Sequence, residues 1–217
     1  MDVTIRPMGE HAVLVEVAGL PQILALDAAL RSAAADGRLT LIVDQIPAAR
    51  TVLVRCDPQV DLGSLQRMLE ILCAGIDLDT AQHVTDPAEE PLVIGVHYDG
   101  PDLTEVAALT GLPIAEVVLA HTSMPWRVAF GGFAPGFGYL VDGDRRLQVP
   151  RRSEPRTSIP AGSVALAGPY SGIYPRSGPG GWQLIGRTDA VLWAVDRNPP
   201  ALLRTGRLVR FTDLDDD

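Results

Sequence analysis

The residue types best suited to chemistry gather in three segments rich in glycine, proline and either aromatic or arginine side chains: residues 130–140, 149–164 and 171–188. The first segment combines glycines, which allow close backbone approach, with the flat side chains of Phe133, Phe137 and Tyr139. Such a loop can form one wall of a pocket. A tight turn whose aromatic side chains fill a core explains the same composition, while the lack of a following Gly-Lys-Ser/Thr excludes a phosphate-binding P-loop.

The second segment is rich in arginine, whose planar guanidinium group pairs well with carboxylate or phosphate. Arg156 is flanked by prolines that hold the chain extended, so we expect it to make a defined contact with an anion. Surface solubility is the simpler explanation for Arg151 and Arg152. Ser163 lacks a Gly-x-Ser-x-Gly elbow and a neighbouring base, which favours a turn hydroxyl or a ligand donor over a nucleophile.

The third segment places consecutive glycines directly before Trp182, which lets the backbone pass close to another group. A hairpin with tightly packed turns explains these glycines. It explains less well why Tyr174 and Arg187 occur in the same segment, and these two residues remain candidates for ligand contacts.

Histidine and cysteine offer little for metal binding. No two of the four histidines lie within four positions of each other, which excludes a zinc-binding helix motif. His121, just before the first segment, could carry a proton or donate a hydrogen bond near neutral pH, although its position favours a core or capping histidine. Cys56 and Cys73 show no Cys-x-x-Cys spacing, so we expect two buried, reduced thiols.

The charge of the chain limits its partners. A formal net charge of −9 repels nucleic acid, and no apolar run is long enough to span a membrane. The N-terminus lacks the features of a signal peptide, which predicts a cytoplasmic protein. Residues 145–187 nevertheless contain seven arginines and only the acid Glu154, so this local basic surface suggests an anionic ligand or an acidic partner.

Periodic patterns predict a small α/β sandwich in the first part of the chain. Apolar residues recur at helical spacing over 20–35 and 62–75, and β-rich runs occupy 12–17, 39–43 and 51–55, with a turn at Pro47. The polar, proline-containing stretch 77–91 is typical of a linker. We therefore predict an N-terminal α/β domain of residues 1–88 and a second domain of residues 89–217.

The second domain shows a strand pattern at 92–98, followed by signals for two short helices. Asp102 and Glu105 form a capping-box pattern, and Pro113 suits a first helical turn. Short β-runs punctuated by glycine and proline then predict a β-barrel or sandwich; they lie at 128–130, 164–167, 182–185, 190–194 and 207–211.

Several motifs in the three segments, taken together and in order, resemble those of a known family. They are Val-Ala-Phe-Gly-Gly-Phe-Ala-Pro-Gly-Phe-Gly-Tyr-Leu at 128–140, Val-Pro-Arg-Arg at 149–152, Pro-Arg-Thr at 155–157, Ile-Pro-Ala-Gly-Ser-Val at 159–164, Gly-Ile-Tyr-Pro at 172–175 and Pro-Gly-Gly-Trp-Gln-Leu-Ile-Gly-Arg-Thr at 179–188. The chain resembles the family that contains the kinase inhibitor KipI, the B subunit of 5-oxoprolinase and allophanate hydrolase subunit 1. It departs from the family pattern at Gly131, Gly138, residues 169–171 and Arg207.

The resemblance implies an α+β protein in which a small N-terminal α/β sandwich domain precedes a C-terminal cyclophilin-like β-barrel. It also implies a partner of the C-subunit, or allophanate hydrolase subunit 2, type and a separate A-type partner of 5-oxoprolinase. The assembly would use ATP, with Mg, to convert 5-oxo-L-proline to L-glutamate, while this chain alone has no recognisable cofactor motif. The alternatives are a component of an allophanate hydrolase or urea carboxylase-type carboxyltransferase, and a KipI-like inhibitor of a histidine kinase.

The resemblance further implies a pocket in this chain. Arg156, His121 and Arg187 would be catalytic, with the arginines neutralising a substrate carboxylate or a transferring phosphoryl group. The substrate would be bound by Phe133, Pro135, Gly136, Phe137, Tyr139, Gly162, Ser163, Tyr174, Gly180 and Trp182. No metal site is predicted.

Overall fold

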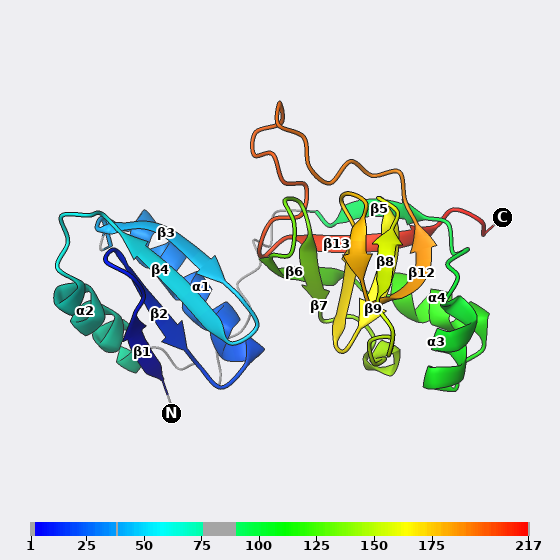
Figure 1. Cartoon of the computed structure of the whole chain (residues 1–217), viewed down its shortest axis with the longest axis horizontal. Helices are drawn as coiled ribbons and strands as arrows, with labels where there is room; N and C mark the ends of the chain where they lie inside the picture. The colour runs from blue at the N-terminus through cyan, green and yellow to red at the C-terminus, as the bar shows by residue number, and fades with distance from the viewer. Residues whose placement is uncertain (1–2, 38, 76–89, 217) are drawn as a thin grey trace. The chain divides into compact units, whose positions relative to one another are not determined.

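The computed structural model describes residues 3–37, 39–75 and 90–216. Backbone contacts divide the chain into two compact units, Met1–Val84 and Thr85–Asp217 (Figure 1). The predicted domain boundary after residue 88 lies outside the described residues and stays a prediction.

The first unit is a four-stranded antiparallel sheet with two helices, in the strand order β1-β2-β4-β3 (Figure 1). Its elements are β1 (Thr4–Pro7), β2 (Ala12–Glu16), α1 (Leu20–Ala35), β3 (Ile42–Pro47), β4 (Thr51–Cys56) and α2 (Leu62–Gly75). Apolar side chains of both helices and of the inner strands form one core, which includes both buried cysteines. The mixed helix and strand pattern predicted for this part is present, with both helices at their predicted bounds.

One strand of this sheet differs from its prediction. The pattern placed a strand at 39–43 and a turn at Pro47, whereas β3 runs to Pro47 and Leu39 is buried in the turn before it. Because β3 lies at the edge of the sheet, the missing N–H of Pro47 costs no strand pairing.

The second unit is built on a seven-stranded sheet in the order β12-β9-β10-β7-β6-β13-β5. Its strands are β5 (Leu92–Val96), β6 (Trp126–Gly131), β7 (Gly138–Val141), β9 (Ser163–Ala167), β10 (Tyr170–Ile173), β12 (Gln183–Arg187) and β13 (Leu208–Asp213). His97, just after β5, pairs with Arg187 of β12 through two backbone hydrogen bonds of 2.9 Å. Since β5 and β12 are the two outer strands, this bridge makes the sheet a nearly closed barrel.

Shorter elements cover the barrel. They are α3 (Leu103–Thr110), α4 (Ile114–Thr122), the 3₁₀ turn η1 (Arg145–Leu147) and a two-stranded sheet of β8 (Arg156–Ile159) and β11 (Gly178–Gly180). Helix α3 contacts β12 and α4 contacts β13. Within the described residues no single helix is long and apolar enough to cross a membrane; only α3 and α4 together, with a 90° bend between them, reach that length and composition.

Alternation along the strands gives the barrel two different apolar clusters. In β10, Ser171 and Ile173 point into the barrel, where the main core lies. Tyr170 and Tyr174, at alternate positions, point outward into a second cluster beneath β8. The site described below belongs to this outer face.

The strand predicted at 190–194 is wrong. The segment forms only an isolated bridge between Trp193 and Ala201, and Val191 is exposed. The Arg197 guanidinium donates hydrogen bonds to the carbonyl oxygens of Val191, Leu192 and Pro200. These contacts satisfy backbone groups that a neighbouring strand would otherwise bind.

Candidate functional site

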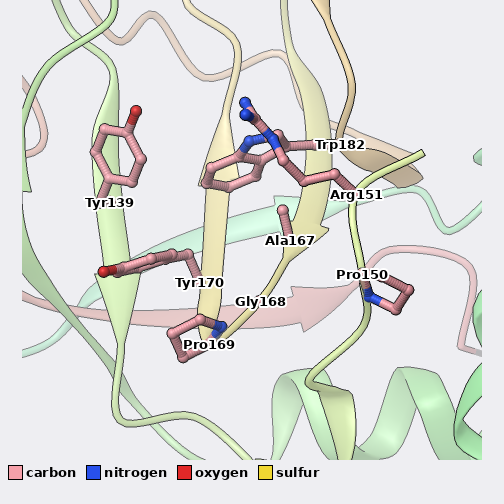
Figure 2. Close-up of a pocket in the computed structure, with 8 residues that line it drawn as sticks. All are labelled: Tyr139, Pro150, Arg151, Ala167, Gly168, Pro169, Tyr170 and Trp182. Carbon is pink, nitrogen blue, oxygen red and sulfur yellow. The ribbon is translucent and has the colours of Figure 1, made fainter. Parts of the chain in front are cut away.

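A cavity of about 360 Å³ opens on the outer face of the barrel. It lies among β7, the turn between β9 and β10, the segment before β8 and the start of β12; its lining residues are Tyr139, Pro150, Arg151, Ala167, Gly168, Pro169, Tyr170 and Trp182. In Figure 2 the side chains of Tyr139 and Tyr170 lie on one side of the cavity, and Pro150 and Arg151 lie on the other. The cavity therefore combines aromatic walls with one guanidinium group.

A packed aromatic cluster supports the cavity. The ring centroids of Tyr139 and Trp182 are 5.6 Å apart, and Trp182 also contacts Phe137 edge-on at 5.4 Å. Gly172 makes this packing possible, since a Cβ there would lie 2.9 Å from Phe137 and 3.0 Å from Trp182. Such closely packed rings hold the walls in fixed positions.

Asp102 connects the start of α3 to the arginine-rich segment. Its carboxylate, only 4% exposed, accepts hydrogen bonds from Arg156 Nη1 and Nη2 at 2.8 Å each and from Arg152 Nη1 at 2.7 Å. The backbone N–H of Leu184 donates a further bond of 2.7 Å. The predicted capping box is therefore wrong, because the Asp102 side chain turns to the arginines and makes no hydrogen bond that caps α3.

Burial alone would raise the pKa of Asp102, but the hydrogen bonds from Arg156 and Leu184 and the charges of the arginines outweigh burial and lower it. Asp102 is therefore ionised at neutral pH. Its charge is shared by two guanidinium groups, so the network holds the segment between Arg152 and Arg156 against α3 and β12.

Arg151 differs from the two arginines that follow it. It lines the cavity and, within the described parts of the chain, forms no hydrogen bond or ion pair. Burial raises the pKa of Tyr174, and the charge of Arg151 acts in the opposite direction. The cavity thus contains one cation that no described carboxylate neutralises.

Two phenol groups, those of Tyr139 and Tyr170, line the cavity. Burial, and to a lesser extent the neighbouring Tyr139, raises the pKa of Tyr170 above its ordinary value. Among the described residues, neither hydroxyl has a hydrogen-bond partner, and the same holds for the indole N–H of Trp182.

The three residues predicted to be catalytic lie apart from this cavity. His121 is fully buried on the inner side of the sheet, between the Tyr98 hydroxyl at 2.7 Å and the Ser171 hydroxyl at 2.9 Å. Arg187 donates to Asp99 at 2.8 Å. Arg156 does contact an anion, as expected, but that anion is Asp102 of the same chain. Their catalytic roles stay predictions.

The residues predicted to bind substrate divide into three groups. Tyr139 and Trp182 line the cavity. Phe137 and Tyr174 are buried in the aromatic cluster, and Phe133 packs edge-on against both of them while remaining 58% exposed. The remaining predicted residues do not line it; they are Pro135, Gly136, Gly162, Ser163 and Gly180.

Close packing explains several of these glycines. Gly162 has a φ of +80°, and a Cβ there would meet the carbonyl oxygen of Thr188. A Cβ on Gly180 would meet the hydroxyl of Tyr174. These positions therefore require glycine for the fold. For Gly180 this agrees with the tightly packed hairpin that was the alternative explanation from sequence.

Sequence reasoning did not select six of the lining residues: Pro150, Arg151, Ala167, Gly168, Pro169 and Tyr170. One signal was available for Arg151. Because the prolines hold its segment extended, adjacent arginines tend to face opposite sides, so a contact by Arg152 on one side leaves Arg151 on the other. No comparable signal marked Tyr170, whose place depends on strand pairing across the barrel.

The described residues contain no cluster of three or more His, Cys, Asp or Glu side chains that could hold a metal ion. The cavity itself offers a single cation and no acidic side chain among the described residues that line it. This set of groups does not fit Mg–ATP, which requires carboxylate or hydroxyl ligands for the ion and several donors for the phosphates.

Comparison with known proteins identifies the family. The family model described as "Carboxyltransferase domain, subdomain C and D" matches residues 3–203. The B subunit of the 5-oxoprolinase of Escherichia coli O157:H7 is 41% identical over 172 residues, which cover 78% of this chain and 77% of that protein. The chain belongs to the family of 5-oxoprolinase B subunits. This confirms the family resemblance that the sequence motifs carry.

Other members of the family of 5-oxoprolinase B subunits and related structures match over different lengths. The B subunit of Bacillus subtilis (strain 168) is 50% identical over 123 residues, 57% of this chain, and the match spans about half (51%) of that protein. The crystal structure of the protein TTHA0988 superposes with a TM-score of 0.76 and 31% identity, covering 99% of this chain but only 41% of that one. The fold of this chain thus also forms part of a longer polypeptide.

Proposed function

We propose that this chain is the B subunit of an ATP-dependent 5-oxoprolinase complex, which converts 5-oxo-L-proline to L-glutamate together with the A and C subunits. The proposal rests on the 41% identity to the Escherichia coli protein over more than three quarters of both chains. The name of that relative supports an assembly of several different subunits, and we propose that the chain is inactive without them.

The proposal assigns ATP to another component of the complex, because the cavity in this chain does not fit Mg–ATP. Opening a lactam ring with water requires charge to be stabilised on the ring oxygen and the substrate to be held in place. The groups of this chain are suited to holding the substrate in place, since Arg151 can bind a carboxylate and the aromatic walls can enclose a small ring. Within this proposal, residues 89–217 form a cyclophilin-like domain, residues 1–88 form a separate α/β domain, and the protein is cytoplasmic.

Reconstitution tests the proposal. The chain is purified with the A and C subunits from the same organism, and ATP hydrolysis and glutamate formation are measured with 5-oxo-L-proline. We expect both products only when all three proteins are present. Glutamate formation at an undiminished rate by the A and C subunits without this chain would contradict the proposal.

A second candidate comes from the carboxyltransferase description of the family model. Under this alternative the chain is subunit 1 of an allophanate hydrolase or urea carboxylase-type enzyme. The same assay distinguishes the two, with urea and allophanate as substrates in place of 5-oxo-L-proline. Turnover of urea or allophanate, without turnover of 5-oxo-L-proline, would favour the alternative.

A further inference from the structure

We propose that the cavity on the outer face of the barrel is a binding site for a small ring carboxylate, in which Arg151 binds the carboxylate and Tyr139, Tyr170 and Trp182 enclose the ring. Taking 5-oxo-L-proline as that ligand rests on the proposed function. The site itself is argued from the following features of this chain.

The positive charge of the cavity lies at one residue, Arg151. Asp102 accepts hydrogen bonds from Arg152 and Arg156, so a buried carboxylate holds these two guanidinium groups, and neither residue lines the cavity. Arg151 lies next to them in sequence but faces the cavity without a described partner. A guanidinium group presented in this way binds one carboxylate through two parallel hydrogen bonds.

The neutral groups of the cavity favour a ligand rich in hydrogen-bond acceptors. The hydroxyls of Tyr139 and Tyr170 and the indole N–H of Trp182 are three donors with no partner among the described residues. A carboxylate next to a ring carbonyl provides acceptors for such a set. The apolar faces of the same three side chains can pack against the ring carbons.

Size and rigidity favour a small ligand. A volume of about 360 Å³ is near the lower end of the roughly 300–1,000 Å³ that is typical of small-molecule sites. Pro150 and Pro169 restrict the backbone on two sides of the cavity, and the aromatic cluster fixes the walls. A site formed before the ligand arrives loses less entropy on binding.

Phosphate is a poorer match than carboxylate. Phosphate sites in proteins commonly combine several cations with backbone N–H groups at a helix N-terminus. The described lining of this cavity includes one arginine and no residue of α3 or α4.

Equilibrium binding to the full chain tests the site. Tryptophan fluorescence is a suitable signal, because Trp182 lines the cavity and is one of three tryptophans. The ligands are 5-oxo-L-proline, 2-pyrrolidinone, which has the same ring without the carboxylate, and L-proline, which lacks the ring carbonyl. We expect 5-oxo-L-proline to bind at least about 10-fold more tightly than 2-pyrrolidinone, the usual effect of a charge-assisted hydrogen bond.

The variant Arg151→Gln isolates the role of the guanidinium. It should weaken binding of 5-oxo-L-proline by about 10- to 100-fold and leave the affinity for 2-pyrrolidinone unchanged. Arg176→Gln is the matched control, since Arg176 is exposed in the same unit and lies outside the cavity. Near-ultraviolet circular dichroism confirms that each variant retains its packed core.

The outcomes separate this inference from the proposed function. An active complex in which Arg151→Gln leaves both the binding affinity and the KM for 5-oxo-L-proline at wild-type values overturns the site and leaves the proposed function intact. Arg151-dependent binding to the free chain, with no turnover by the assembled complex, supports the site and contradicts the proposed function. If the free chain binds nothing, a KM raised at least about 10-fold by Arg151→Gln in the complex supports the site, and an unchanged KM overturns it.

Discussion

Among the individual residues, His121 shows how burial decides the role of a titratable group. Its ring is fully buried, stacks on Phe211 with centroids 4.3 Å apart, and has a hydroxyl partner on each nitrogen. Burial lowers the pKa of His121 from 6.5 to about 3, so the ring is neutral at physiological pH. This environment suits a structural histidine that joins α4 to the barrel.

The lowered pKa predicts how stability depends on pH. The unfolded chain takes up a proton at His121 near pH 6.5, whereas the folded chain does so only near pH 3. Stability from the neutral ring is therefore complete above about pH 6.5 and is lost as the pH falls toward 3, by up to about 1.4 kcal/mol per pH unit. Urea unfolding at pH 7, 6 and 5, followed by tryptophan fluorescence, measures this loss in the second unit, which contains all three tryptophans.

The variant His121→Gln provides the comparison, because glutamine can keep a hydrogen bond but does not take up a proton. Its unfolding free energy should depend less on pH between 7 and 5 than that of the wild type. His11→Gln is the matched control, because His11 lies in the first unit and the tryptophan signal reports on the second; its pH profile by this signal should match that of the wild type. Identical pH profiles for the wild type and His121→Gln would contradict the prediction.

Among the secondary-structure elements, the segment before β8 is held in place by an ion-pair network. Asp102 at the start of α3 joins Arg152 of this segment and Arg156, the first residue of β8, to the backbone of β12. Pro150 and Arg151, which line the cavity, directly precede the first of these arginines. The network therefore sets the position of one wall of the cavity, although Asp102 itself does not line it.

Replacing Asp102 with asparagine tests this role. The change leaves Arg152 and Arg156 without their carboxylate, and we expect a loss of about 2–3 kcal/mol in unfolding free energy, less than for a fully buried pair since both arginines are partly exposed. Because Arg151 remains, binding of 5-oxo-L-proline should weaken while the preference over 2-pyrrolidinone is kept. Calorimetric unfolding and the binding titration measure the two effects.

Asp99→Asn is the matched control for Asp102→Asn. Asp99 also pairs with an arginine, Arg187, but both side chains are about half exposed, so the pair should contribute less than about 1 kcal/mol. Equal effects of the two substitutions would show that the buried network has no special role in holding the segment.

Across the whole molecule, each compact unit has its own apolar core. The core of the first unit uses residues only from Val3 to Cys73, and the two clusters of the second unit use residues only from Leu92 onward. Separate cores are the property that lets domains fold alone.

We therefore predict that residues 89–217 expressed alone fold cooperatively and keep the cavity. The expected result is dispersed amide signals in NMR and an affinity for 5-oxo-L-proline within about 3-fold of that of the full chain, the usual scatter of context effects on single interactions. The full chain is the reference sample. A collapsed fragment without fixed packing would contradict the predicted division at residue 88.

Local sequence patterns were sufficient to predict much of this fold and its family. Helical spacing located α1 and α2, glycine and proline punctuation marked the barrel, and ordered motifs between residues 128 and 188 identified the family. These signals are local or are carried by contiguous motifs, so they can be recognised without knowledge of the fold.

Which side chains meet could be learned only from the folded chain. Asp102 lies about fifty positions before its arginine partners and has the spacing of a helix cap, so no local pattern marks it as the anion that Arg152 and Arg156 bind. Likewise, strand pairing turns Tyr170 toward the cavity and its neighbour Ser171 toward buried His121. These contacts join residues far apart in the sequence, and the chemistry of the site therefore depends on tertiary structure.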